Sequence, residues 1–140
     1  MTGPSLTRID HVGIACHDLE AAVDRYQRLF GLAVVARETH DDQGVHEAML
    51  EVVSGSYVQL LQPTRPDSPV GRFLARHGEG VHHIGYGVDD VQAALDALDG
   101  QGVRLVDRRP RHGSMGASIA FVHPKDVDGV LTELVQAGPR

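Results

Sequence analysis

Hydrophobic and polar positions alternate with the two-residue period of a β-strand over residues 8–15 and again over residues 81–88. Apolar residues at helical spacing follow each segment, at residues 19–30 and 91–98. Shorter strand-like runs come next in both halves. We expect these strands at about Leu32–Thr39, Val45–Val53 and Tyr57–Gln62, and at about Arg104–Arg108, Ser118–His123 and Gly129–Gln136.

The two halves are related by an internal repeat. His11 aligns with His83, 72 residues later, and Gly13 aligns with Gly85. This period is too long for a solenoid, so it indicates two fused copies of one unit. The predicted fold is α+β, with two tandem βαβββ modules that form a curved mixed sheet around a metal-binding cleft. We expect a single domain over residues 1–140, divided into module one at about 8–62, a linker at about 63–79 and module two at about 80–136.

Residues at the ends of the predicted helices are typical caps. Asp18 is a suitable N-cap for the first helix, and Gly31 is a suitable C-cap. Asp89 or Asp90 begins the helix of the second half. The linker starts with prolines and then contains an amphipathic run at residues 70–76, which predicts a loop followed by a short helix.

Ligand-type residues repeat at equivalent positions of the two halves. His11 and His83 lie on the first strand of their halves, where glycine and alanine share the same strand face. Gln59 and Glu133 occupy equivalent positions on the last strand of each half. Two imidazoles, a carboxylate and an amide oxygen suit a divalent transition metal. A lone strand histidine is usually structural, but the repetition favours one metal site built from these four residues.

Other candidate residues lack the support of the repeat. Glu47 shares a predicted strand face with Val45 and Met49, and it is either an exposed strand glutamate or a desolvated carboxylate that acts as a base near neutral pH. His82 adjoins His83, but the strand face and the repeat favour His83. We expect structural or surface roles for the remaining histidines, which are His17, His40, His46, His77, His112 and His123.

Composition excludes several classes of protein. With 13 basic and 19 acidic residues, the net charge is −6, and no basic run predicts nucleic-acid binding. No segment has the length of a membrane span, and because the first eight residues contain no long apolar stretch, we expect no secretory signal. Cys16 is the single cysteine, so an intrachain disulfide is impossible, and a cytoplasmic location is expected.

The motifs together resemble the methylmalonyl-CoA epimerase family of the vicinal oxygen chelate superfamily. The resemblance runs from about Ile9 to Gln136, and its most specific parts are the blocks around His83 and Lys125. The matching motifs are DHVGIA at residues 10–15, QGV at 43–45, DSP at 67–69, GEGVHH at 78–83, FVHPK at 121–125 and GVLTEL at 129–134.

The resemblance implies interconversion of the (2R) and (2S) epimers of methylmalonyl-CoA through an enolate. It places the family's metal ligands on the four residues that the repeat selects, and its catalytic glutamate on Glu47. It implies Co²⁺ as the metal, with Ni²⁺, Zn²⁺ or Mn²⁺ as alternatives, and a homodimer as the assembly. Glu133 is a candidate for returning the proton on the opposite face. A water molecule on the metal, or an enolate reprotonated without a second residue, are alternatives.

Contacts with the acyl-CoA substrate are open at this stage. Five basic residues could meet CoA phosphates or simply form a solvated surface: Arg104, Arg108, Arg109, Arg111 and Lys125. The segment at residues 114–116 is either a loop against the acyl chain or a turn.

Three other functions use related folds. A lactoylglutathione lyase-type isomerase has a similar metal site, but the QGV and HPK blocks argue against it. The two histidines and Glu133 are compatible with the iron site of a ring-cleaving dioxygenase, but Gln59 is less compatible with it. A metal-free protein that sequesters an antibiotic would not need the repeated ligand set.

Overall fold

The computed structural model describes residues 3–139. These residues form two compact units: an N-terminal unit of residues 11–82, and a C-terminal unit of residues 83–139 with residues 3–10. The chain passes between the units within strand β1 (Arg8–Ala15) and within strand β5 (Gly80–Gly87). None of the helices among the described residues has the length and apolar character that a membrane-spanning helix needs.

The strands of the N-terminal unit form a mixed sheet in the order β2-β3-β4-β1. β2 (Ala33–His40), β3 (Val45–Val53) and β4 (Ser56–Pro63) pair in antiparallel fashion, and β1 pairs with β4 in parallel. A two-residue turn at Ser54-Gly55 joins β3 to β4, and Gly55 has a φ of 84°, which glycine adopts without steric cost. These strands confirm the prediction for the first half of the chain.

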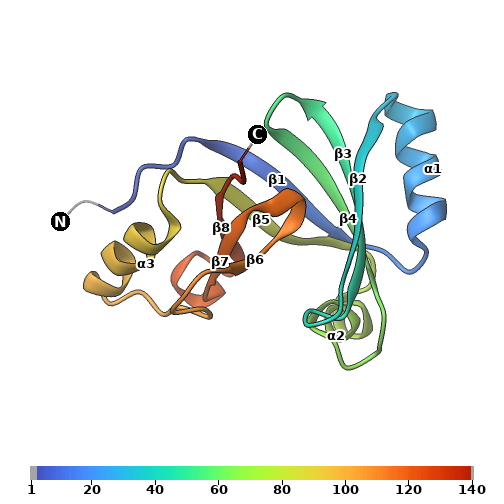
Figure 1. The fold of residues 1–140 in the computed structure, drawn as a ribbon. Helices are drawn as coiled ribbons and strands as arrows, with labels where there is room; N and C mark the ends of the chain where they lie inside the picture. The colour runs from blue at the N-terminus through green and yellow to red at the C-terminus, as the bar shows by residue number, and fades with distance from the viewer. Residues whose placement is uncertain (1–2, 140) are drawn as a thin grey trace. The chain divides into compact units, whose positions relative to one another are not determined.

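Helix α1 (Leu19–Phe30) covers one face of this sheet (Figure 1). Its N-terminus is capped by the Asp18 carboxylate, which accepts a hydrogen bond of 3.1 Å from the amide of Ala21. Gly31 ends the helix in the left-handed conformation, with a φ of 67°. Both caps are as predicted. The buried core beneath the helix consists of Cys16, Leu19, Ala22, Val23, Ala48, Leu50 and Leu60.

Helix α2 (Pro69–His77) packs against the opposite face of the same sheet. Ser68 caps its N-terminus by accepting a hydrogen bond of 3.0 Å from the amide of Gly71. Val70 and Leu74 pack with Val45 and Leu61 of the strands, in a separate apolar cluster. The helix therefore excludes water from part of the sheet face that α1 does not cover.

The C-terminal unit repeats this arrangement with shorter strands. Its order is β5-β8-β7-β6, with β8 (Thr132–Gln136) parallel to β5, and with β7 (Ser118–Val122) and β6 (Arg111–His112) antiparallel. Helix α3 (Val91–Gly100) is capped by Asp90, which accepts a hydrogen bond of 3.0 Å from the amide of Ala93. The core under α3 comprises Val88, Val91, Ala94, Leu95, Ala120, Val122 and Leu134.

The predicted strand at Arg104–Arg108 is wrong. The structure has a single bridge, Leu105 to Val122, in this segment, and the neighbouring edge strand is β6. In a regular strand, a backbone carbonyl of this segment would accept from the amide of Phe121. Here the side chain of Asp107 accepts instead, with Oδ2 at 2.9 Å from that amide nitrogen. The Asp126 carboxylate likewise accepts from the amide of Arg104 at 2.7 Å.

The predicted last strand, Gly129–Gln136, begins three residues late, at Thr132. Asp128 and Gly129 both have positive φ, 52° and 82°, and the amide of Gly129 donates to the carbonyl of Pro124 at 2.8 Å. This turn follows the short 3₁₀ helix Pro124–Asp126, and it delays the extended conformation. The division into one domain with modules at 8–62 and 80–136 stays a prediction.

The core under α1 allows a direct test of stability. Leu60 is fully buried, whereas Leu29 on α1 is 57% exposed. We expect Leu60→Ala to lower the free energy of unfolding by about 2–5 kcal/mol, because it removes buried methyl groups and leaves a cavity. Leu29→Ala is the matched control and should change it by less than about 0.5 kcal/mol. Urea denaturation followed by circular dichroism measures both; equal losses for the two variants would contradict the assigned core.

Candidate functional site

Polar side chains line the face of the N-terminal sheet that is opposite α1. On this face Gln59 of β4 lies beside Gly13 of β1, and it lies beside Met49 of β3 on its other side. His11 precedes Gly13 by two residues and therefore shares the face. His11 is 3% exposed, Gln59 is 6% exposed and Glu47 of β3 is 1% exposed. Such burial of polar groups is costly unless they are hydrogen-bonded or hold an ion.

The Glu47 carboxylate is held at both oxygens within this unit. Its Oε1 is 2.6 Å from Nε2 of His40 on β2, and its Oε2 accepts a hydrogen bond from the side-chain amide of Gln59. Burial excludes the exposed alternative that the sequence left open for Glu47. The carboxylate is therefore desolvated and oriented, as a general base must be.

His40 is the residue of this site that sequence reasoning missed. Its position in β2, seven residues before Glu47, places it diagonally across the antiparallel pair. The hydrogen bond to Glu47 raises the pKa of the His40 imidazole, and the acidic side chains of Glu38 and Asp42 act in the same direction. A hairpin in which two polar residues point to one face is the signal that could have identified it.

The C-terminal unit carries its own buried polar pair. His83 of β5 is 3% exposed and Glu133 of β8 is 5% exposed, and His83 Nε2 lies 2.9 Å from Glu133 Oε1. The ring of Phe121 on β7 meets the ring of His83 edge-on, with centroids 5.5 Å apart. Arg111 lies over the same phenyl ring at 5.2 Å. The imidazole is thus fixed by packing as well as by the carboxylate.

The two units place their polar residues in matching registers. Gly13 is the strand partner of Gln59, and Gly85 is the strand partner of Glu133. In each unit a histidine lies two residues before that glycine, on the same strand face. Neither glycine adds a side chain beside the histidine and its neighbour. The repeat seen in the sequence is therefore a repeat of geometry.

The donor atoms are of a type that fits a metal. Imidazole nitrogen and carboxylate oxygen are both common ligands of divalent transition metals, and His83 Nε2 and Glu133 Oε1 lie 2.9 Å apart. His11, His83 and Glu133 are all buried, and together they supply a His/His/Glu set that could hold a metal ion. Their nitrogen and oxygen atoms do not select one transition metal.

A second acidic group in the N-terminal unit, formed by Glu38, His40 and Glu47, also has ligand atoms close enough for an ion. Two of its three side chains, Glu38 and His40, are only partly buried. Within this group, His40 Nε2 and Glu47 Oε1 are already in contact at 2.6 Å.

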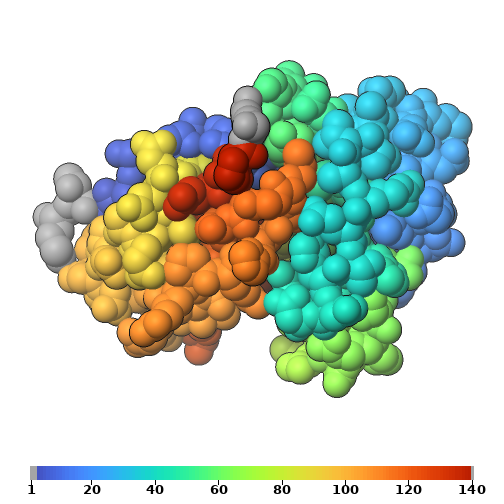
Figure 2. Space-filling model, viewed as in Figure 1, coloured from blue at the N-terminus to red at the C-terminus, as the bar shows by residue number. Residues whose placement is uncertain are grey.

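Three of the basic residues considered for CoA binding have acidic partners in the C-terminal unit. Arg104 pairs with Asp126 at 2.9 Å, Arg108 with Asp99 at 3.6 Å, and Arg111 with Asp107 at 3.2 Å. The Arg104 guanidinium holds the pKa of the Asp126 carboxyl well below its usual range. The segment that carries most of these arginines, orange in Figure 2, lies on the visible surface.

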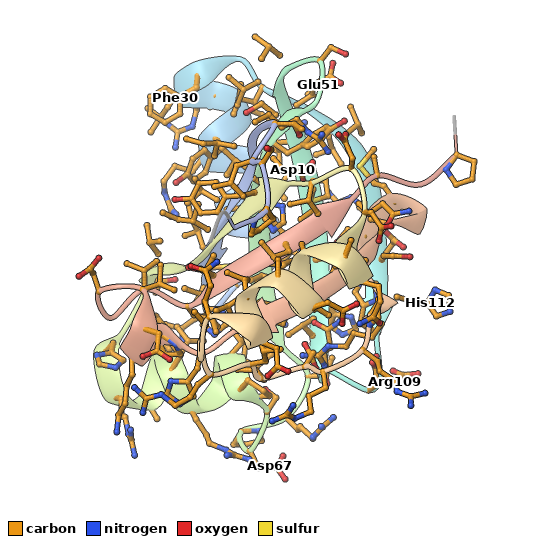
Figure 3. All side chains as sticks on the ribbon, turned by 90° about the vertical axis from the view of Figure 1, so that its left-hand side faces the viewer. Asp10, Phe30, Glu51, Asp67, Arg109 and His112 are labelled. Atoms are coloured by element: carbon orange, nitrogen blue, oxygen red, sulfur yellow. The ribbon has the colours of Figure 1, made fainter. Side chains whose placement is uncertain are left out.

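The remaining residues considered from the sequence have different surroundings. The side chain of Arg109 extends outward into solvent, as Figure 3 shows. Ser114–Gly116 forms a short 3₁₀ turn in which Met115 has a φ of 57°. Burial, assisted by the charge of Glu79, raises the pKa of the Cys16 thiol to about 11, so it is protonated at neutral pH and is a poor nucleophile.

Comparisons with known proteins support one family. Residues 10–121 match the Glyoxalase/Bleomycin resistance protein/Dioxygenase superfamily. The ethylmalonyl-CoA/methylmalonyl-CoA epimerase of Cereibacter sphaeroides is 38% identical over 92% of this chain and 97% of its own length. A structure of the Mycobacterium tuberculosis methylmalonyl-CoA epimerase is 40% identical, with a TM-score of 0.93, and covers 99% of this chain and 93% of that one.

The solved structure of a Streptomyces coelicolor methylmalonyl-CoA epimerase has a higher sequence identity to this chain than the two relatives above. A variant of that enzyme, in complex with 2-nitronate-propionyl-CoA, is 53% identical, with a TM-score of 0.92, over 96% of this chain and 100% of that one. The similarity thus covers both units and every strand that carries a buried polar residue. The chain belongs to the methylmalonyl-CoA epimerase family of the glyoxalase/bleomycin resistance/dioxygenase superfamily.

Proposed function

We propose that this chain interconverts the (2R) and (2S) epimers of methylmalonyl-CoA, with Glu47 removing the proton at C2. The observation that carries the proposal is a desolvated carboxylate, 1% exposed, in a chain 53% identical to an epimerase that binds 2-nitronate-propionyl-CoA. A nitronate is planar and anionic, like the enolate left when a C2 proton is removed. Analogues that resemble the transition state in this way bind an enzyme more tightly than its substrate does.

Glu47 begins the reaction by accepting the C2 proton, and the electrons of the C–H bond pass into the thioester as an enolate. His40 and Gln59 hold the two oxygens of the carboxylate, so little reorganisation is needed when the substrate arrives. The cluster of α2 with Val45 and Leu61 lies along the same strand face and keeps water from that part of it.

His11, Gln59, His83 and Glu133 are the proposed ligands of one divalent metal, with Co²⁺ as the expected ion and Ni²⁺, Zn²⁺ or Mn²⁺ as alternatives. When bound, the ion supplies Lewis-acid stabilisation of the negative charge that develops on the thioester oxygen. The support for this set is the matching register of the two units and the 2.9 Å separation of His83 and Glu133.

Epimerisation requires the proton to return on the opposite face of C2. The strand position that Glu47 occupies in the first repeat is occupied by Ile119 in the second, because Met49 pairs with Gln59 as Phe121 pairs with Glu133. The second repeat therefore offers no copy of this base. Glu133 is the proposed donor for the second face, since it is the buried carboxylate on that unit's ligand face.

The first prediction from the proposed function concerns the base. Glu47→Gln keeps the shape of the side chain but removes its basicity, so epimerisation should fall by about 10²–10⁴-fold. Metal content should stay near that of the wild type. Conversion of (2S)- to (2R)-methylmalonyl-CoA, followed with an epimer-specific coupling enzyme, measures the loss. Glu51→Gln on the same strand is the control, because Glu51 is exposed (Figure 3).

Full activity in Glu47→Gln, with its metal content unchanged, would contradict the assignment of the base. A matching loss in Glu51→Gln would show that the assay reports disturbance of β3 rather than proton transfer.

The second prediction concerns the metal. His11→Ala and Glu133→Ala remove one proposed ligand from each repeat, and each should weaken metal binding by at least about tenfold. Titration with Co²⁺, followed by visible absorption and by metal analysis after dialysis, gives the affinity without an activity assay. His17→Ala is the control, since His17 is exposed. If one of the two ligand variants bound Co²⁺ like the wild type, the two repeats would not share an ion.

The third prediction concerns assembly. Homodimers remain our expectation because β2 lies at the end of the strand order in the described residues, and a free strand edge is usually covered. Val35 of this strand is 44% exposed. Sedimentation equilibrium at micromolar concentration should give twice the mass of one chain, and a single-chain mass would contradict the dimer. A cytoplasmic location likewise stays a prediction.

A further inference from the structure

The buried base lies next to a histidine that the proposed reaction uses only to hold the carboxylate. Glu47 is 1% exposed at its side chain, whereas the His40 side chain that contacts it is 14% exposed. We propose that His40 is a proton relay, which carries protons between Glu47 and solvent. This inference rests on the proposed function, because it gives the proton taken from C2 a way to leave.

The need for a relay follows from the use of two different residues on the two faces of C2. After one turnover, Glu47 holds a proton that it lacked, and the donor on the other face lacks one that it held. A second turnover in the same direction requires both residues to return to their starting states. A carboxyl group that is almost fully shielded from water exchanges its proton slowly unless a neighbouring group carries it.

The geometry suits transfer along the His40–Glu47 contact. His40 pairs with Val45, two residues before Glu47 on the adjacent strand, so both side chains project from the same face of the β2–β3 hairpin. The distance of 2.6 Å between Nε2 and Oε1 is that of a short, charge-assisted hydrogen bond. Gln59 holds the other oxygen, so the contact to His40 keeps its orientation.

Imidazole is suited to this role because it has two nitrogens that bind and release protons. The proton on Oε1 of Glu47 passes to Nε2 of His40, and the ring releases the proton of its other nitrogen to water. The net result is one proton delivered to solvent, with Glu47 again ionised and the ring in its other tautomer. The reverse sequence reloads Glu47.

Acidic groups surround the relay and favour a proton on the ring. Glu47 faces it from β3, Glu38 lies on its own strand, and Asp42 lies in the turn that follows. All three raise the pKa of His40, so the imidazolium form is accessible near neutral pH. His46 does not belong to this group, since it is exposed and is bonded to Thr39 at 2.7 Å.

The test separates proton carriage from the mere holding of Glu47. His40→Gln retains an N–H donor at about the position of Nε2, but an amide does not exchange protons near neutral pH. His40→Leu removes both functions. The substrate is (2S)-methylmalonyl-CoA deuterated at C2, in ordinary water, with the metal-loaded protein. Two quantities are measured with a rapid-quench, epimer-specific assay: the rate at which the first equivalent of the (2R) epimer forms per site, and the steady-state rate of epimerisation. Mass spectrometry follows the loss of deuterium from C2.

The relay predicts that His40→Gln completes the first turnover of each site at a rate within a few-fold of the wild type, while steady-state epimerisation falls by about tenfold or more. The deuteron then stays on Glu47, which is not ready to accept a proton from the next substrate molecule. His40→Leu should slow the first turnover as well. His46→Gln is the matched control from the same hairpin and should match the wild type in both quantities.

Two results would overturn the relay. An unchanged ratio of the first-turnover rate to the steady-state rate in His40→Gln, relative to the wild type, would show that His40 only positions Glu47. An equal fall of both quantities in His40→Gln and His40→Leu would show a structural role. If the wild-type protein itself neither epimerises the substrate nor releases deuterium, the proposed function fails, which is a distinct outcome from failure of the relay.

Discussion

Each unit of the chain buries polar side chains on one face of a sheet whose other face carries the apolar core. A strand has two faces, and its residues alternate between them. Helices α1 and α3 cover one face, and the histidines and carboxylates lie on the other, beside smaller apolar clusters. Groups such as His11 and Glu47 are at most 3% exposed, and they persist there only if hydrogen bonds or an ion satisfy them. The need to satisfy these buried groups explains the close contacts around Glu47 and between His83 and Glu133.

Duplication explains why ligand-type residues occur in both repeats. Divergence between the repeats explains why the base, Glu47, occurs in only one. Both repeats keep a histidine, a glycine two residues later and a ligand-type residue across from that glycine. At the next position along the ligand face, the first repeat has Glu47 and the second has Ile119. A symmetric ancestor could supply matched ligands, but a reaction at one carbon needs its base on one side. His40, with its bond to Glu47, belongs to the same asymmetry.

Strand and helix order were predictable because the repeat could be checked against itself. β1 and β5 carry the alternation clearly, and Asp18 and Gly31 mark the ends of α1 as helix caps usually do. The segment at residues 104–108 was mispredicted because Asp107 and Asp126 bond to backbone amides in place of strand carbonyls. Long-range contacts of this kind leave no local pattern. His40 was overlooked for the same reason, since its partner Glu47 becomes a neighbour only when β2 and β3 pair.

A crystal structure of the metal-loaded chain with 2-nitronate-propionyl-CoA tests the central claim most directly. That claim is that both repeats contribute to one site, in which Glu47 faces C2 of the substrate. The account predicts a single ion bound by His11, Gln59, His83 and Glu133, with a Glu47 oxygen within about 3.5 Å of C2. An ion bound by one repeat alone, or a Glu47 carboxylate directed away from C2, would contradict it.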